Sequence, residues 1–255
     1  MMKKMFYATL DSTKTWKQIV DALATLLTEI HLVVSSSGIK LTQYDSSRAA
    51  MVDMELPRSV FQQYTCTEEH DICLGVAEVV KVSKRMTGDD RLVFNLDQSE
   101  KRFEIKMIGH AERTFKLQLL TPPEERTQKI TPNFDIQAEL LSDAFKHVVK
   151  DIGVVSNHLK ITAGNDTLTF SGEGDTGEVE VVMKVGGDES SLFSLRTMNE
   201  ATSMYALSYL IEIAKAISGD SITLQMTAYK PILLEFSIAE SGGIRYLLAP
   251  RVERR

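Results

Sequence analysis

The stretch "SSSGIKLTQYDSSRAAM", from Ser35 to Met51, decides how the rest of this sequence is interpreted. Two mainly apolar runs, residues 31–35 and 39–44, flank a Ser-Gly pair, and this pattern predicts two strands joined by a tight turn. A polar cluster at residues 45–48, "DSSR", then interrupts the pattern. The cluster fits a catalytic Asp-Ser pair, a capped turn or the signature of a known scaffold, and the remaining chain must distinguish these.

A helix is predicted just before this stretch, because apolar side chains recur there at spacings of three and four residues. The apolar stripe contains Trp16, Ile19, Val20, Leu23, Leu26, Leu27 and Ile30. Asp11 or Ser12 is the expected N-cap. The helix is therefore expected to begin at residue 12 and to reach residue 30.

The second half of the chain repeats the order of the first. A second helical stripe contains Leu141, Ala144, Phe145, Val148 and Ile152. "HLVVSSSGIKL" from His31 resembles "HLKITAGNDTL" from His158, 127 residues later, and two predicted helix ends, at Gly88 and Gly219, are 131 residues apart. Two similar offsets indicate a tandem duplication.

The two halves are separated by a segment rich in proline. "TPPEERTQKITPNF" has few apolar residues and no periodicity, so it is expected to be an extended linker. We expect one domain in residues 1–120, a linker in residues 121–133 and a second domain in residues 134–255. The fold class is α+β, with antiparallel sheets and two helices in each domain.

Composition limits the function. With 255 residues, 43% hydrophobic and 25% charged, the chain can bury a substantial core, and no stretch is long and apolar enough for a membrane span. A soluble, intracellular protein is expected. The net charge of −6 argues against indiscriminate coating of nucleic acid, although it allows a local basic surface. Cys66 and Cys73 are expected to be free thiols.

Several short motifs resemble catalytic sites without the context that catalysis needs. "GEGDTG", residues 172–177, matches a dinucleotide pattern, but its acidic residues repel phosphate and a strand-like run follows, so a hairpin loop is expected. "EEHD", residues 68–71, is expected to be a solvated loop. Asp45 with Ser46 lacks a histidine base nearby. His31, His110 and His158 lie in strand-like stretches and are expected to be ordinary, partly buried side chains.

Together, "SSSGIKLTQYDSSRAAMVDMEL", the duplicated layout, the proline-containing linker and the closing "GGIRYLLAPRVE" resemble the proliferating cell nuclear antigen family of sliding DNA clamps. The resemblance implies a ring-shaped homotrimer of two-domain subunits that encircles double-stranded DNA without regard to sequence. It implies no enzymatic activity and no cofactor or metal. The implied partners are the clamp loader (replication factor C), DNA polymerase, flap endonuclease and DNA ligase, and no membrane. The location would be cytoplasmic in an archaeon and nuclear in a eukaryote.

The resemblance also implies three sets of functional residues. Cationic side chains on the four predicted helices would contact DNA: Lys14, Lys17, Lys81, Lys84, Arg85, Lys146, Lys150 and Lys215. A water-facing apolar pocket would bind a short partner peptide: Tyr44, Arg48, Ala49, Met51, Ile130, Pro231, Leu247, Ala249, Pro250 and Val252. Edge strands at residues 113–119 and 178–184 would join subunits, with Arg113 and Lys116 facing Glu178 and Glu180.

Two alternatives stay open at this point. Within the family, the chain could be one member of a hetero-trimer or of a checkpoint-type ring. In a different class, it could be a small nucleotide-dependent hydrolase that uses "GEGDTG". Arg48 and Leu247 also differ from the residues common in the family, which are a histidine and an aromatic, so partner preference is open.

Overall fold

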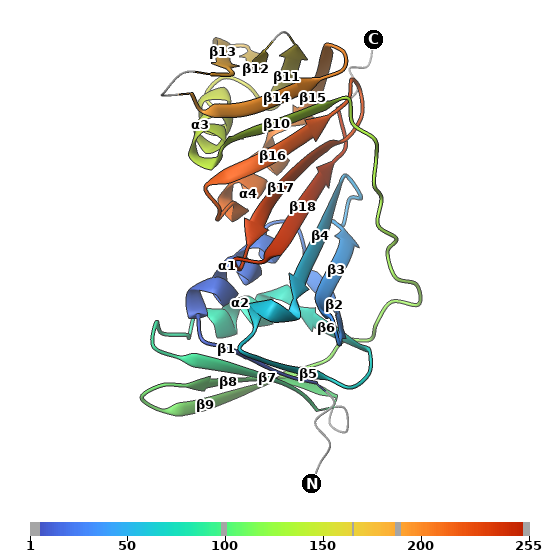
Figure 1. Cartoon of the computed structure of the whole chain (residues 1–255), viewed down its shortest axis with the longest axis vertical. Coiled ribbons are helices and arrows are strands. Elements are labelled where there is room, and N and C mark those ends of the chain that lie inside the picture. The colour runs from blue at the N-terminus through green and yellow to red at the C-terminus, as the bar shows by residue number, and fades with distance from the viewer. Residues whose placement is uncertain (1–5, 98–100, 165, 187–189, 252–255) are drawn as a thin grey trace. The chain divides into compact units, whose positions relative to one another are not determined.

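The computed structural model describes residues 6–97, 101–164, 166–186 and 190–251. They form two compact units, shown in Figure 1. The first unit takes its described residues from 1–46, 52–129 and 237–244, and the second takes them from 47–51, 130–236 and 245–255. Most of the linker segment, up to Lys129, is therefore grouped with the first unit.

The first half of the chain contains nine strands, two α-helices and one short 3-10 helix among its described residues. In order they are β1 (Phe6–Leu10), α1 (Thr13–Ala24), β2 (Glu29–Ser35), β3 (Gly38–Tyr44), β4 (Ala50–Pro57), η1 (Arg58–Val60), β5 (Gln63–Cys66), β6 (His70–Gly75), α2 (Val76–Ser83), β7 (Arg91–Asp97), β8 (Arg102–Ile108) and β9 (Glu112–Gln118). Five strands pair in the order β5-β1-β7-β8-β9, and four in the order β4-β3-β2-β6.

The second half repeats this succession. It contains β10 (Ile136–Leu141), α3 (Ser142–Ile152), β11 (His158–Gly164), β12 (Thr167–Gly174), β13 (Gly177–Lys184), β14 (Leu192–Thr197), β15 (Ala201–Ala206), α4 (Leu207–Ala216), β16 (Ser221–Met226), β17 (Ile232–Ile238) and β18 (Gly242–Leu248). The strand orders are β14-β10-β16-β17-β18 and β13-β12-β11-β15. The predicted duplication and the α+β class are confirmed.

The structure changes the alignment of the two halves by two residues. Val76 and Leu207 open equivalent helices, and their N–H groups donate to the carbonyls of Thr28 and Asn157. Thr28 and Asn157 are 129 residues apart and each lies just before an equivalent strand, β2 or β11. His31 is therefore equivalent to Lys160, and the predicted match between His31 and His158 is wrong.

Helix α1 forms for the predicted reason but ends earlier. Ser12 is the N-cap, and its hydroxyl accepts a hydrogen bond from the N–H of Thr15. The apolar stripe is buried as far as Leu23, and the helix ends at Ala24. Ile30 is buried as well, but it lies in β2, where it pairs with Leu74. A buried strand residue thus continued the spacing of the helix by coincidence.

The helices of each half pack as a pair over their own sheets. In the first unit, the ring of Trp16 on α1 lies 4.6 Å from that of Phe94 on β7. In the second, Phe145 on α3 and Phe170 on β12 make an edge contact in the core. Burying one face of each helix leaves the opposite face, which carries the lysines, toward solvent.

Several local predictions can be compared directly with the structure. "GEGDTG" lies in a hairpin, where Gly174 pairs with Gly177 across β12 and β13. Both cysteines are free, and burial raises the pKa of Cys73 to about 11, which keeps this thiol protonated. The loop predicted for residues 68–71 is only half correct, because His70 and Asp71 belong to β6. His110 lies in the turn after β8 instead of a strand.

Candidate functional site

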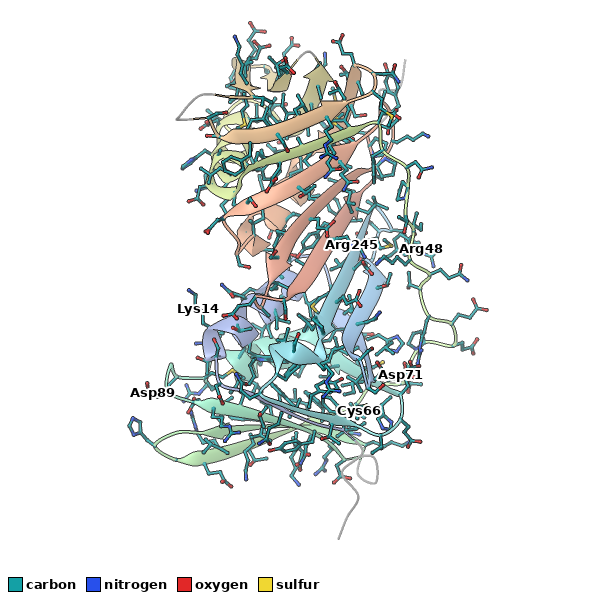
Figure 2. The ribbon with its side chains drawn as sticks, viewed as in Figure 1. Lys14, Arg48, Cys66, Asp71, Asp89 and Arg245 are labelled. Atoms are coloured by element: carbon teal, nitrogen blue, oxygen red, sulfur yellow. The ribbon has the colours of Figure 1, made fainter. Side chains whose placement is uncertain are left out.

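The first helix presents two of the predicted cationic side chains. Lys14 is exposed on the first turn of α1 and is labelled in Figure 2. Lys17 is half-buried, and its ammonium donates a hydrogen bond to the carbonyl of Met86 over 3.0 Å. Lys17 therefore ties α1 to the segment that follows α2, while Lys14 has no ion pair among the described residues.

The second helix is shorter than predicted. It ends at Ser83, so Lys84 is its C-cap and Arg85 lies in the following turn. All three cations of this region are exposed, and Lys81 lies 4.0 Å from Glu78. Lys84 and Lys81 also lie where the negative end of the helix dipole favours cations.

In the second half, two of the three predicted lysines are partly neutralised on their own helix. Lys146 pairs with Asp143 at 3.1 Å, and Lys215 pairs with Glu212 at 2.6 Å. Lys150 is exposed in the last turn of α3 and has no ion pair within the described part of the chain. Exposed pairs of this kind are weak, so these ammonium groups remain available to a phosphate.

A buried carboxylate organises the turn after α2. Asp90 is 1% exposed and accepts hydrogen bonds from the N–H of Thr87 and from the guanidinium of Arg113. The hydrogen bond from Thr87 and the charge of Arg113 hold the pKa of Asp90 below its usual range, although burial opposes this. Arg113 also donates to the carbonyl of Arg85 over 2.9 Å. Edge strand β9 and the cationic turn are thereby fixed to each other.

This arrangement corrects one part of the predicted subunit contact. Strands β9 and β13 do end their strand orders, as expected. Along β9, however, Arg113 and Lys116 point to opposite faces, because successive side chains alternate. Arg113 is paired with Asp90 within the chain, whereas Glu178 and Glu180 share one exposed face of β13. Lys116 is on the exposed face of β9, and it pairs with Glu104 at 3.0 Å.

The residues assigned to the partner pocket divide into buried and exposed groups. Met51 is 3% exposed and Leu247 is 7% exposed, so the expectation that they form a water-facing surface is wrong. Ile130 is 48% exposed. Arg48 is exposed and has a left-handed backbone (φ 58°), and Ala49 accepts a hydrogen bond from the N–H of Ala249. The remaining members are half-buried Tyr44, Pro231 and Pro250; Val252 lies outside the described residues.

Leu247 and Met51 have an ordinary reason to be buried. Both are strand residues on β18 and β4, and both contribute to the apolar core. Within the second unit, the exposed members of the set are Arg48, Ala249 and Ile130. The structure brings Ala49 and Ala249 together by a hydrogen bond of 2.8 Å. Because Met51 and Leu247 are buried, fewer apolar side chains of the set face water than predicted.

The linker is held to the first unit by ion pairs that the sequence did not reveal. Arg126 bonds to Glu69 at 2.6 Å and forks onto Asp71 at 2.9 and 3.0 Å. His31 also contacts Asp71, at 2.6 Å. Burial raises the pKa of Asp71, but the hydrogen bonds from Arg126 and His31 outweigh it and leave the pKa below its usual range. Figure 2 labels Asp71 at this point.

A second ion pair lies three residues farther along the linker. Lys129 pairs at 3.1 Å with Asp53, a buried carboxylate on β4 that also accepts a hydrogen bond from Thr42. The partners Arg126–Asp71 and Lys129–Asp53 are far apart in sequence, so spacing alone gave no signal for them. The only available hint was two basic residues, Arg126 and Lys129, in a proline-rich stretch that also contains Glu124 and Glu125.

Metal binding and membrane spanning have no support in the described residues. No group of three or more His, Cys, Asp or Glu side chains is placed to hold a metal ion there. No helix in the described part of the chain is long and apolar enough to cross a membrane. Two like units of antiparallel sheet, paired helices with exposed cations and a strand edge in each half define instead the class of DNA sliding clamps.

Comparisons with known proteins give the family. The model of the proliferating cell nuclear antigen N-terminal domain matches residues 5–120, and that of the C-terminal domain matches residues 130–251. The DNA polymerase sliding clamp of Thermofilum pendens is 33% identical over 94% of this chain and 96% of its own, and that of Thermococcus gammatolerans is 30% identical over 97% and 99%. The crystal structure of the Thermococcus kodakaraensis protein matches with a TM-score of 0.90 and 27% identity, over 96% of this chain and 100% of the other. The chain belongs to the proliferating cell nuclear antigen family.

Proposed function

We propose that this chain is a subunit of a DNA polymerase sliding clamp that acts as a non-catalytic scaffold. The observation that carries the proposal is the duplicated unit, because the same succession of strands and two helices occurs twice and each copy presents cationic helices. The archaeal sliding clamps named above cover nearly the whole chain, which supports the same function. Since these relatives are archaeal, a cytoplasmic location at DNA follows from the proposal.

The proposed assembly is a homotrimeric ring closed by strand pairing. Strand β9 ends one strand order and β13 ends another, so each has backbone donors and acceptors available for a neighbour. A head-to-tail contact between two different edges closes into a ring when the rotation per subunit allows it. Lys116 on β9, opposite Glu178 or Glu180 on β13, would add charge complementarity.

The proposed DNA contact is electrostatic and independent of sequence. Lys14, Lys84, Arg85 and Lys150 are its strongest members, because each is exposed and has no ion pair among the described residues. Lys17, Lys81, Lys146 and Lys215 would contribute less, since each has a partner within the chain. Contacts to phosphate alone position a protein without reading bases, and that allows sliding.

The proposed partners are the clamp loader, the polymerase, flap endonuclease and ligase, each through a short peptide. Support comes from Ile130, which is exposed in the linker, and from Arg48 and Ala249, which are also exposed. Because Met51 and Leu247 are buried, they would support the floor of this site instead of forming its open surface.

One experiment tests the proposed function. The purified chain is measured for mass in solution and then added, with a clamp loader and ATP, to a replicative polymerase on a primed single-stranded circle. A trimer that lengthens the product made in one binding event supports the proposal. A stable trimer that leaves product length unchanged contradicts it. A monomer that assembles only with a different clamp subunit would identify a member of a hetero-trimer.

A further inference from the structure

The linker shows how one sheet of this fold binds an extended segment. It crosses the face of the strand order β4-β3-β2-β6. Arg126 bonds to Glu69, just before β6, and to Asp71 on β6, whereas Lys129 pairs with Asp53 on β4. Outer strands of four are about 14 Å apart, and three extended residues span about 10 Å, so the long side chains supply the rest. Two basic residues, three positions apart, therefore join the two sides of the sheet.

The second unit has an equivalent face, which can be identified residue by residue. The N–H of Arg58, after β4, donates to the carbonyl of Ser37, and the N–H of Val185, after β13, donates to that of Asp166. Five residues earlier in the two strands lie Asp53 and, at the equivalent position, Glu180. The carboxylate that binds Lys129 in the first unit thus has a counterpart in Glu180.

The second carboxylate of the linker site has a counterpart as well. Glu69 directly precedes β6, and Glu200 directly precedes the equivalent strand β15. The exit of the chain is also repeated, because Leu120 bonds to the carbonyl of Cys73 and Arg251 bonds to that of Met204, the equivalent position. Two features are not reproduced: the position of Asp71 in β15 is Thr202, and His31, which contacts Asp71, corresponds to Lys160.

This second face is hollowed and carries no covering segment in the described part of the chain. Its lining includes Ser156, His158, Lys160, Ser171, Glu173, Glu178, Glu180, Met204 and Arg251. Glu173 and Glu178 are direct cross-strand partners, and like charges placed opposite each other favour a cation between them.

The charges on this face add up to a negative surface. Burial, and secondarily the charge of Arg251, lower the pKa of His158, so its ring is neutral at pH 7. In the lining of the hollow, the carboxylates Glu173, Glu178 and Glu180 then outnumber the cations Lys160 and Arg251. Outside the lining, Glu200 adds one negative charge and Lys184, on the exposed face of β13, adds one positive charge. The excess lies toward β13, where three of these carboxylates gather.

We propose that the face formed by β13, β12, β11 and β15 is a second docking surface, which binds an extended segment of a partner protein with two basic residues three positions apart. One basic side chain contacts Glu180, with Glu173 and Glu178 nearby, and the other contacts Glu200. The segment crosses the strands as the linker crosses the equivalent strands of the first unit. This surface is separate from the residues assigned to DNA contact and to the partner pocket, and it shares Glu178 and Glu180 with the proposed subunit edge.

The linker itself supplies the probe. A fluorescent peptide copying residues 121–131 is titrated with the full chain at low salt, and binding is followed by anisotropy. Glu180→Gln and Glu200→Gln should each weaken binding by at least about fivefold, whereas Glu139→Gln, an exposed carboxylate on β10, should change it by less than about twofold. A peptide with glutamate in place of Arg126 and Lys129 should not bind.

The outcomes separate the proposal from its alternatives. Because β13 is the proposed subunit edge, the mass in solution is measured for each variant. If Glu180→Gln alters assembly, the binding measured with Glu200→Gln decides the result. Equal binding of the peptide by all variants overturns the proposal. Binding that is lost in Asp53→Asn but retained in Glu180→Gln and Glu200→Gln also overturns it, because the peptide would then be replacing the chain's own linker on the first unit. Association beyond the wild-type assembly that disappears in Glu200→Gln would identify a second copy as the occupant and would also overturn it. None of these results depends on polymerase stimulation.

Discussion

At the scale of single residues, Asp90 connects two segments of the first unit that are distant in sequence. Its carboxylate is buried, and it joins the turn after α2 to β9 through Thr87 and Arg113. A buried charge whose partner is removed costs much more than a pair at the surface. The turn that carries Arg85 therefore depends on Asp90, although Asp90 is not one of the proposed DNA contacts.

Asp90→Asn should lower the free energy of unfolding by about 1.5 kcal/mol at pH 7, because it removes a charged hydrogen bond to Arg113, whose side chain stays partly exposed to water. The pKa of Asp90 is lowered by folding, so its stabilising effect is complete above the unfolded pKa of about 3.9 and is lost as pH falls through the folded value. Unfolding measured at pH 7 and at a pH below the folded pKa of Asp90 should show the difference at the higher pH only.

The matched control is Asp89→Asn, because Asp89 is the exposed neighbour labelled in Figure 2. It should change stability by less than about 0.5 kcal/mol. Equal destabilisation by Asp90→Asn at both pH values would mean that the ion pair does not account for the effect.

Leu247→Ala should lower the free energy of unfolding much more than Ile130→Ala does. Leu247 is 7% exposed, so its truncation should cost about 2–5 kcal/mol, whereas Ile130 is 48% exposed and should cost about 0.5 kcal/mol or less. If Ile130 borders the partner pocket, Ile130→Ala should also weaken a polymerase tail peptide in calorimetry. An unchanged affinity, with unfolding temperature intact, would place the pocket elsewhere.

At the scale of elements, the cations of the second helix are concentrated at its C-terminal end. Lys81 lies in the last turn of α2, Lys84 is its cap, and Arg85 follows in a turn anchored by Arg113. This arrangement places three cations within five residues, with Glu78 as the nearest described acid on the helix. The end of α2 is consequently the densest part of the proposed DNA surface.

Replacing Lys81, Lys84 and Arg85 together by alanine should leave assembly intact and reduce polymerase stimulation, most strongly as salt is raised. Each lost phosphate contact lowers the slope of log affinity against log salt by about 0.9. Stimulation is measured across a salt titration, beside a control with alanine at Lys40, Lys106 and Arg196, which lie on strands outside the proposed subunit contact. Identical salt curves for the two variants would show that these three cations do not contact DNA.

At the scale of the whole molecule, the proposed ring would use two of the strand edges, β9 and β13. Glu178 and Glu180 share an exposed face of β13, and Lys116 lies on an exposed face of β9. A cross-strand charge pair contributes about 0.2–1 kcal/mol, so it tunes a contact that backbone pairing makes. Arg113 already has a partner in Asp90, so Lys116 is the cation of β9 that we test.

Lys116→Glu should weaken the trimer, and adding Glu180→Lys should restore part of the loss, because the exchanged pair again attracts. The measurement is sedimentation over a dilution series, where the single variant should dissociate at a higher concentration than the parent. A double variant weaker than either single variant would show that these residues are not opposite each other.

Local patterns were enough to predict much of the fold. The hairpin of β2 and β3 followed from a Ser-Gly turn, and α3 followed from its apolar stripe, because both depend on neighbours in sequence. The alignment of His31 with His158 failed because similar letters lay two residues away from the equivalent positions. The bonds of Asp90 with Arg113 and of Arg126 with Asp71 join distant segments, so only the folded chain reveals them.

The anchored turn after α2 also affects how easily the proposed ring would slide along DNA. Since Arg113 fixes the carbonyl of Arg85 and Asp90 fixes the N–H of Thr87, the backbone there is already ordered before any phosphate arrives. Only side-chain torsions would then rearrange as a contact passes from one phosphate to the next, and exposed rotamers change within nanoseconds. Each step along a duplex would meet a low barrier, so one-dimensional diffusion of the ring would be limited by drag in water more than by breaking of its own contacts.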